Sequence, residues 1–170
     1  PVSGVVQNMY KTPLESPKVT AVELYSGALP YTLARSIELE AIRYMLEMRY
    51  TRKIREERGG TYGVGVSLTY QKEPLPRFAY QIFFETDTAK IGELLPLVGE
   101  EIRALVTEGV TADELTRTKE FFLKRHRDGL IHNGTWLGYL TSWYLNDNDR
   151  YDGYEAAVQA LTSESVRAAA

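Results

Sequence analysis

The stretch from Arg55 to Val66 reads REERGGTYGVGV, and it contains both a helix end and a strand start. The pair Gly59 and Gly60 follows a run of charged residues that favour helices, and glycine is the residue at which helices commonly end. From Tyr62 to Tyr70, large apolar residues alternate with small ones, which is the two-residue period of a half-buried strand. The stretch therefore predicts a helix, a glycine turn and a strand, in that order.

Upstream of this stretch, the spacing of the apolar residues changes along the chain. From Tyr31 to about Glu57 they recur at intervals of three and four, which predicts a long amphipathic helix that ends at the glycine pair. Two earlier segments, Val2 to Tyr10 and Val19 to Tyr25, are rich in β-branched and aromatic residues. They predict two short strands around a loop that contains Pro13 and Pro17.

Downstream, a second alternating segment runs from Phe78 to Phe84, and the connection to it holds Pro74 and Pro76, which predicts a hairpin with a longer loop. The remaining sequence predicts helices. The first helix covers Ile91 to Val106 and ends at Gly109, and Pro96 either bends it or delays its start. The second runs from Ala112 to about His132, with a capping box at Thr111. After an interruption at Gly134, three more helices are predicted: one over Trp136 to Leu145, one over Tyr154 to Leu161, and a last one capped by Thr162 or Ser163.

This order of elements predicts an α+β fold. We expect a mixed or antiparallel sheet that helices cover on one face, with a long helix, a glycine turn and a hairpin before a helical C-terminal half. The absence of a strict β–α alternation argues against a doubly wound fold. The 170 residues suit a single domain over 1–170. Because the chain begins at Pro1 and ends at Ala170 within a predicted helix, we expect it to be a fragment of a longer chain, truncated at both ends.

Composition excludes several classes of function. The 20 basic residues against 23 acidic ones leave a net charge of −3, so no basic surface for nucleic acid is expected. The chain has no cysteine, which excludes a disulfide scaffold, a thiol nucleophile and a cysteine-ligated metal. No apolar run approaches the roughly 18 residues of a membrane span, so no membrane partner is expected.

Most candidate chemistry fails on spacing. His126 and His132 lie six residues apart, about 120° around a helix, so the pair cannot chelate one ion unaided, and we expect no metal site in this chain. The glycines near position 60 match neither phosphate-loop pattern and lie between a helix and a strand, which is the wrong order. No nucleophile elbow is present, and Glu100 and Glu101 point in different directions on a helix. The aromatic residues Trp136, Tyr139, Trp143 and Tyr144 recur at helical spacing, which is typical of a core or an interface.

The stretch around Gly59 is different, because a helix end delivers Arg55 and a strand opens with Tyr62 seven residues later. Its chemistry alone also fits a structural turn with a salt-bridging arginine and a packed tyrosine. However, the run REERGGTYGV resembles the signature in the C-terminal half of the pitrilysin/insulinase-type zinc metallopeptidases, the inverzincins. The run Thr111 to Leu115, followed by Lys119, looks like the start of a later helix in the same family, and the resemblance covers nearly the whole chain.

This resemblance implies a fold, a reaction and roles for particular residues. In that family two homologous halves enclose a chamber, the N-terminal half holds zinc through H-x-x-E-H, and the C-terminal half supplies an arginine and a tyrosine to the substrate. The matching positions here are Arg55 and Tyr62, the expected catalytic residues. Gly59 and Gly60 match the turn between them, and with Gly63 they are the expected substrate-binding positions.

The implied roles agree with the chemistry of peptide hydrolysis. A tyrosine hydroxyl suits the tetrahedral oxyanion, and an arginine can hold a peptide carbonyl or carboxylate through a forked contact. The edge of the strand from Tyr62 to Tyr70 offers main-chain pairing to an extended peptide. The resemblance thus implies a substrate-binding domain of a zinc-dependent metalloendopeptidase, with zinc as the cofactor of the parent enzyme and none bound by this fragment.

The chain departs from the family by lacking H-x-x-E-H. We therefore expect an N-terminal zinc-binding domain as its partner, on the same chain or on a second subunit, with a peptide as substrate and no activity in the fragment alone. Two alternatives stay open: a non-catalytic scaffold or interaction domain of the same fold, and an unrelated α+β ligand-binding domain with an accidental Arg–Tyr spacing. The location is unknown, and the acidic, cysteine-free composition with the family's bacterial members weakly favours the periplasm.

Overall fold

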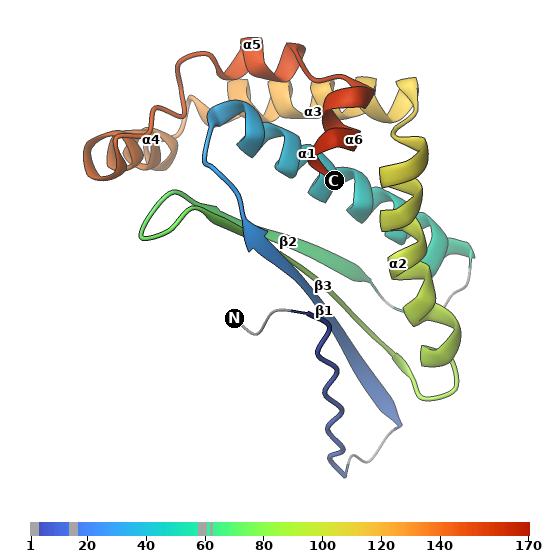
Figure 1. Ribbon diagram of the computed structural model, residues 1–170. Coiled ribbons are helices and arrows are strands. Elements are labelled where there is room, and N and C mark those ends of the chain that lie inside the picture. The colour runs from blue at the N-terminus through green and yellow to red at the C-terminus, as the bar shows by residue number, and fades with distance from the viewer. Residues whose placement is uncertain (1–3, 14–16, 58–60, 62) are drawn as a thin grey trace.

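The computed structural model describes residues 4–13, 17–57, 61 and 63–170, except for the side chains of residues 55–57 and 146. One strand and a long helix precede the hairpin, and helices follow it (Figure 1). The elements are β1 (Lys18–Ala28), α1 (Leu33–Tyr50), a π-helix η1 (Thr51–Glu57), β2 (Val64–Gln71), β3 (Arg77–Asp87), α2 (Ile91–Glu108), α3 (Ala112–Gly129), α4 (Asn133–Asn146), α5 (Tyr154–Gln159) and α6 (Ser163–Ala169). The predicted α+β fold is confirmed.

In the described part of the chain, the sheet has three strands in the order β1-β3-β2, and both pairings are antiparallel. The hairpin β2–β3 forms as predicted, and β1 pairs with the other side of β3. In the register, Phe83 of the central strand lies opposite Val22 on one side and Gly65 on the other. The strand β2 is therefore an edge of the sheet, immediately after the stretch that the sequence singled out.

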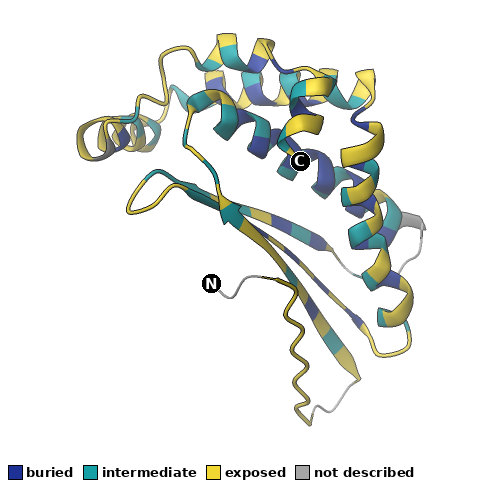
Figure 2. Ribbon diagram, viewed as in Figure 1, coloured by how far each residue is buried: buried dark blue, intermediate teal, exposed yellow. Residues whose placement is uncertain are grey.

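Helices cover one face of the sheet, as predicted (Figure 1). The face toward the helices is apolar, and its residues Val66, Ile82 and Phe84 are buried in the core. The opposite face carries Val22 and Phe83, which are 57% and 43% exposed. Figure 2 shows the same contrast along the strands, where buried and exposed residues alternate. The two-residue period therefore separates a core face from an open face.

The helix α1 lies across the sheet and forms the centre of the core. It begins at the N-cap Thr32, whose hydroxyl accepts a hydrogen bond from the backbone N–H of Arg35 at 3.0 Å. Its buried side includes Met45 and Leu46. Tyr80 of β3 donates a hydrogen bond to the Leu39 carbonyl at 2.7 Å, which joins helix and sheet. The α-helix ends at Tyr50 rather than continuing to Glu57, because the last seven residues form the wider π-helix η1.

The corner between α2 and α3 follows the predicted signals. Gly109 ends α2 with a positive φ of 79°, a conformation that favours glycine. Thr111 and Glu114 form a complete capping box at the start of α3. Pro96 lies inside α2, which already begins at Ile91, so the alternative of a delayed start is wrong. Thr162 caps α6.

Three other predictions are wrong. The segment 4–10 forms no strand, since Val5, Met9 and Tyr10 are exposed and find no packed surface, and β-propensity expresses the fit to such a surface. The helix α3 ends at Gly129 instead of at His132. Gly134 lies in the first turn of α4, where it does not interrupt a helix.

The helix α4 extends away from the rest of the helical layer (Figure 1). Its sequence contains no charged residue, and Leu137, Trp143 and Tyr144 are more than half exposed. Of the predicted aromatic stripe, Trp136 and Tyr139 contact Tyr151, whereas Trp143 and Tyr144 stack on each other at the surface. Within the described ranges, no helix combines the length and hydrophobicity of a membrane span.

Candidate functional site

The candidate site lies where α1 and η1 lead into β2. Arg55 belongs to the π-helix η1, but its side chain lies outside the described residues, as do Gly59, Gly60 and Tyr62 entirely. The described residues on either side lie in η1 and immediately before β2. Their contacts show what holds these two segments in place.

On the strand side, Thr61 and Gly63 form a small local turn. The Thr61 hydroxyl donates to the Gly63 carbonyl at 3.0 Å and accepts from the Gly63 N–H at 3.3 Å. A Cβ added to Gly63 would meet nothing within 4 Å, so packing does not require glycine at this exposed position. A role for Gly63 in substrate binding remains a prediction.

On the helix side, η1 is anchored from within the core. Tyr50, the last residue of α1, is fully buried and donates a hydrogen bond to the Val98 carbonyl of α2 at 3.1 Å. Ile54, one turn further on, is also fully buried. A π-helix of this length is rare in proteins, and π-helical turns occur frequently at functional sites. Arg55 follows Ile54 directly.

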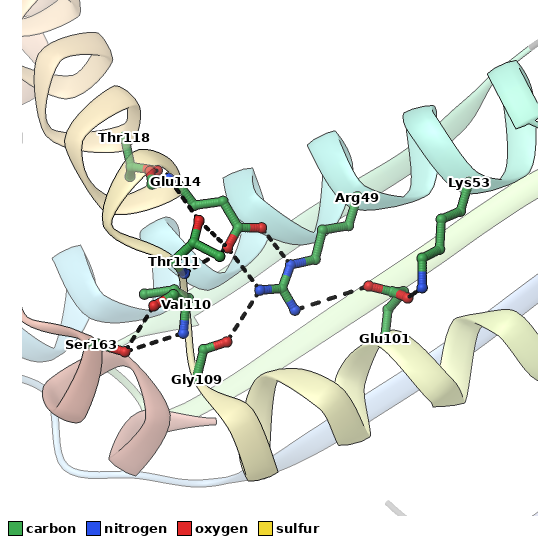
Figure 3. Close-up of polar contacts among 9 residues, drawn as sticks. All are labelled: Arg49, Lys53, Glu101, Gly109, Val110, Thr111, Glu114, Thr118 and Ser163. Atoms are coloured by element: carbon green, nitrogen blue, oxygen red, sulfur yellow. Dashed lines mark hydrogen bonds and ion pairs between the residues drawn. The ribbon is translucent and has the colours of Figure 1, made fainter.

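A charged cluster made of Arg49, Lys53, Glu101 and Glu114 lies beside this anchor (Figure 3). Arg49 makes a forked contact with Glu114, with Nε at 2.7 Å from Oε1 and Nη2 at 2.9 Å from Oε2. Its Nη2 also donates to the Gly109 carbonyl at 3.1 Å, at the end of α2. One guanidinium group thus joins α1 to the corner between α2 and α3.

Glu101 occupies the other side of the same guanidinium group. Its Oε2 lies 3.9 Å from Nη1 of Arg49, and its Oε1 forms an ion pair with Nζ of Lys53 in η1. Glu101 is only 4% exposed, and buried charged groups in proteins are paired, as Glu101 is with these two cations. Two positive and two negative side chains therefore form a balanced cluster that links η1, α1, α2 and α3.

The electrostatics of Glu114 reflect this arrangement. Burial alone raises the pKa of the Glu114 carboxyl group, but hydrogen bonds from Arg49 and Thr111 and the positive charge of Arg49 outweigh burial and lower the pKa to about 2. The hydrogen bonds with Glu114 raise the pKa of Arg49 against the opposing effect of desolvation. Both groups are therefore charged at neutral pH.

Sequence reasoning missed this cluster, although it left a signal. Arg49 falls within the apolar stripe of α1, and Glu101 falls on the stripe of α2 that Leu94, Val98 and Leu105 define. A charged residue at a stripe position is rarely fully buried unless it is paired. A base on one stripe and an acid on the facing stripe predict an ion pair between them.

The described residues do not fit a zinc site. They contain no group of three or more histidine, aspartate or glutamate side chains that could hold a metal ion. His126 is buried, stacks on Tyr154 with ring centroids 4.5 Å apart, and lies 3.2 Å from the Tyr139 hydroxyl through Nδ1. His132 is the N-cap residue of α4. The two histidines thus belong to different environments.

The comparisons with known proteins agree with this fold. The family model for the peptidase M16 inactive domain matches residues 6–122, more than half of the chain. No curated protein matches the chain in sequence.

Solved structures of proteases share the fold. The periplasmic protease PqqL from Escherichia coli superimposes with a TM-score of 0.79 at 18% identity, over 92% of this chain and 18% of that one. A peptidase M16 inactive domain from Pseudomonas fluorescens gives 0.69 at 24% identity, over 91% of this chain and 37% of that one. The inactive peptidase domain of a putative zinc protease from Bordetella parapertussis gives 0.66 at 13% identity, over 92% and 84%.

The chain spans less than a fifth of PqqL and less than two fifths of the Pseudomonas chain, so it corresponds to one part of such proteins. At these identities the structural likeness establishes the fold, and the family model establishes the relationship. The chain belongs to the peptidase M16 family and matches the domain of that family that is described as inactive.

Proposed function

We propose that this domain binds extended peptides for a zinc-dependent metalloendopeptidase whose zinc-binding half lies elsewhere, on the same chain or on a partner subunit. The observation that carries the proposal is the family match over residues 6–122, which includes the whole segment from Arg55 to Tyr62. The unsuitability of the described residues for zinc supports a division of labour between two domains. In this proposal residues 1–170 act as one domain.

Arg55 and Tyr62 are the proposed contacts with the substrate. Hydrolysis converts the planar scissile carbonyl group into a tetrahedral oxyanion, and a donor aimed at that oxygen lowers the barrier, typically by a factor of ~10²–10³ in kcat. The Tyr62 hydroxyl would donate to this oxygen, and the Arg55 guanidinium would hold a neighbouring carbonyl or carboxylate group of the peptide. Gly59, Gly60 and Gly63 would let the backbone turn close to the substrate.

The free edge of β2 is the proposed pairing surface for the peptide backbone. β2 lies at the edge of the described sheet and begins directly after this segment, so a peptide paired with it would run past the proposed contacts. Main-chain pairing gives affinity without demanding a particular sequence. At Val66 of this strand, the backbone carbonyl oxygen accepts a hydrogen bond of 3.5 Å from Nη1 of Arg43 in α1.

A second candidate function is a scaffold or interaction domain without a role in the reaction. The observation that favours it is the uncharged helix α4, whose exposed apolar side chains, including Trp143 and Leu145, are typical of interfaces. A periplasmic location is part of the first proposal and is supported only by the similar structure of PqqL, which is described as periplasmic.

The test is cleavage of an unstructured fluorogenic peptide by the polypeptide together with its zinc-binding half. Tyr62→Phe removes one hydroxyl group and is expected to lower kcat at least ten-fold with little change in KM. Tyr10→Phe removes a hydroxyl group from an exposed tyrosine outside α4 and serves as the matched control, with no change expected. Activity that is indifferent to Tyr62→Phe would refute the role of Tyr62, and a wild type without peptidase activity would favour the scaffold.

A further inference from the structure

Lys53 of η1 pairs with a carboxylate in the core. It lies two residues before Arg55 and forms its ion pair with Glu101 of α2, while its own side chain is 37% exposed. Ile54, the next residue in the sequence, is buried in the core. The packing of Ile54 and the ion pair of Lys53 thus both hold the backbone that delivers Arg55.

The acidic partner of this ion pair is held from the other side. Glu101 lies at the buried stripe of α2 and faces Arg49, and Arg49 is in turn fixed by its forked contact with Glu114 and by the Gly109 carbonyl. Forked arginine–carboxylate contacts restrict both partners in direction as well as in distance. Lys53 therefore pairs with a carboxylate whose position depends on α1, on α3 and on the end of α2.

A gain in stability does not by itself account for this ion pair. A buried ion pair often contributes little net stability compared with well-packed apolar residues, because desolvation offsets the attraction. Tyr50 and Ile54 already bury this end of the helix. What the ion pair adds is a second attachment of the π-helical segment to α2, next to Ile54.

We propose that Lys53 and Glu101 are positioning residues that hold the π-helical segment, and with it the backbone of Arg55, in the place that the proposed peptide contact requires. This inference rests on the proposed function. Neither residue touches the substrate; each acts through the backbone that carries Arg55. A misplacement of about 1 Å in a substrate-contacting group can cost on the order of a hundred-fold in rate, so a small shift of η1 is enough to matter.

The experiment combines three changes at the ion pair with one at its proposed target. Lys53→Met removes the charge and keeps most of the side-chain length, Lys53→Arg keeps the charge, and the double variant Lys53→Met with Glu101→Gln leaves no unpaired carboxylate in the core. Each is made in the wild type and in an Arg55→Ala background. Asp113→Asn is the matched control, since Asp113 pairs with Arg117 at the surface and both side chains are 67% exposed.

The readouts are kcat and KM for the fluorogenic peptide, measured with the zinc-binding half present, and the thermal unfolding midpoint. In the wild-type background, Lys53→Met and the double variant are expected to lower kcat about ten-fold with KM within about two-fold, while Lys53→Arg retains activity. In the Arg55→Ala background the same changes are expected to have less than a two-fold effect, because the group that they position is gone.

The outcomes separate this inference from the proposed function. A ten-fold loss on Lys53→Met that persists in the Arg55→Ala background shows a general structural role and overturns the inference. If Arg55→Ala lowers activity but Lys53→Met does not, the positioning role alone is wrong. If Arg55→Ala leaves activity unchanged, the proposed function of Arg55 fails, and the positioning role fails with it.

Discussion

Replacing Glu114 with Gln tests the charged cluster most directly, because the two residues differ in charge and hardly in shape. Glu114 has two roles: its side chain completes the capping box with Thr111, and it accepts the forked contact from Arg49. A glutamine at this position of a capping box can still accept from the N-cap N–H. The variant therefore keeps the helix cap and removes the ion pair.

The expected loss follows from the pKa of the Glu114 carboxyl group. Burial raises this pKa, yet the contacts with Arg49 and Thr111 lower it from 4.5 to about 2, which corresponds to about 3 kcal/mol of interaction with the charged form. The side chain is 19% exposed, so screening by solvent reduces this figure, and part of it belongs to the retained cap. We expect Glu114→Gln to lower the free energy of unfolding by about 2 kcal/mol at neutral pH.

The dependence on pH has a definite sign. Because folding lowers the pKa of Glu114, its contribution is fully present above pH 4.5 and is lost as the pH falls toward about 2. Urea unfolding of both proteins at about pH 7 and about pH 2.5 measures this contribution. The difference between wild type and Glu114→Gln should be about 2 kcal/mol in the first case and fall to about 0.5 kcal/mol in the second, where the unfolded carboxyl group is protonated and the folded one has begun to be. A difference that stays constant over this range would refute the reasoning, and Asp113→Asn, at an exposed pair, should change stability by less than about 0.5 kcal/mol.

Two further predictions concern the sheet. A Cβ on Gly65 would lie 2.2 Å from Cζ of Phe83, so Gly65→Ala should displace that ring and lower the free energy of unfolding in urea by about 1 kcal/mol. This loss should disappear when Phe83 is also replaced by Ala, and a loss that persists in the double variant would contradict the contact. Tyr80→Phe removes the hydrogen bond to the Leu39 carbonyl and should lower the free energy of unfolding by about 1 kcal/mol, whereas Tyr144→Phe, at the surface, should leave it unchanged; equal effects of the two would show that the Tyr80 hydroxyl group contributes nothing.

The elements that the sequence predicted correctly are those that local chemistry determines. Gly109 ends α2 because its positive φ suits glycine. Thr111 starts α3 because its side chain accepts a hydrogen bond from the Glu114 N–H, and the Glu114 side chain accepts one from the Thr111 N–H. The alternation in β2 and β3 shows directly which face of the sheet is buried. In each case the interacting residues lie within a few positions of one another.

The predictions that failed depended on distant partners. Residues 4–10 have the composition of a strand, but a strand needs a neighbour, and the described residues provide none for this segment. The change from α-helix to π-helix after Tyr50 could not be predicted from helix propensity, since Thr51 to Glu57 is compatible with either form of helix. At the candidate site, the spacing of Arg55 and Tyr62 is visible in the sequence, whereas the cluster that anchors η1 leaves only an indirect signal, Arg49 and Glu101 on apolar stripes.

Glu114 shows why local reasoning reaches only part of this site. Its capping role is visible in the sequence because Thr111 lies three residues away. Its partner Arg49 lies 65 residues away, on the helix α1 that precedes the hairpin in the sequence. The same carboxylate thus starts α3 and fixes the end of α1, and through Arg49 it faces Glu101, the partner of Lys53. We therefore expect a change at the cap of α3 to alter the position of η1. If Arg55 contacts a peptide as proposed, the stability of that corner and the geometry of the contact are coupled through one guanidinium group.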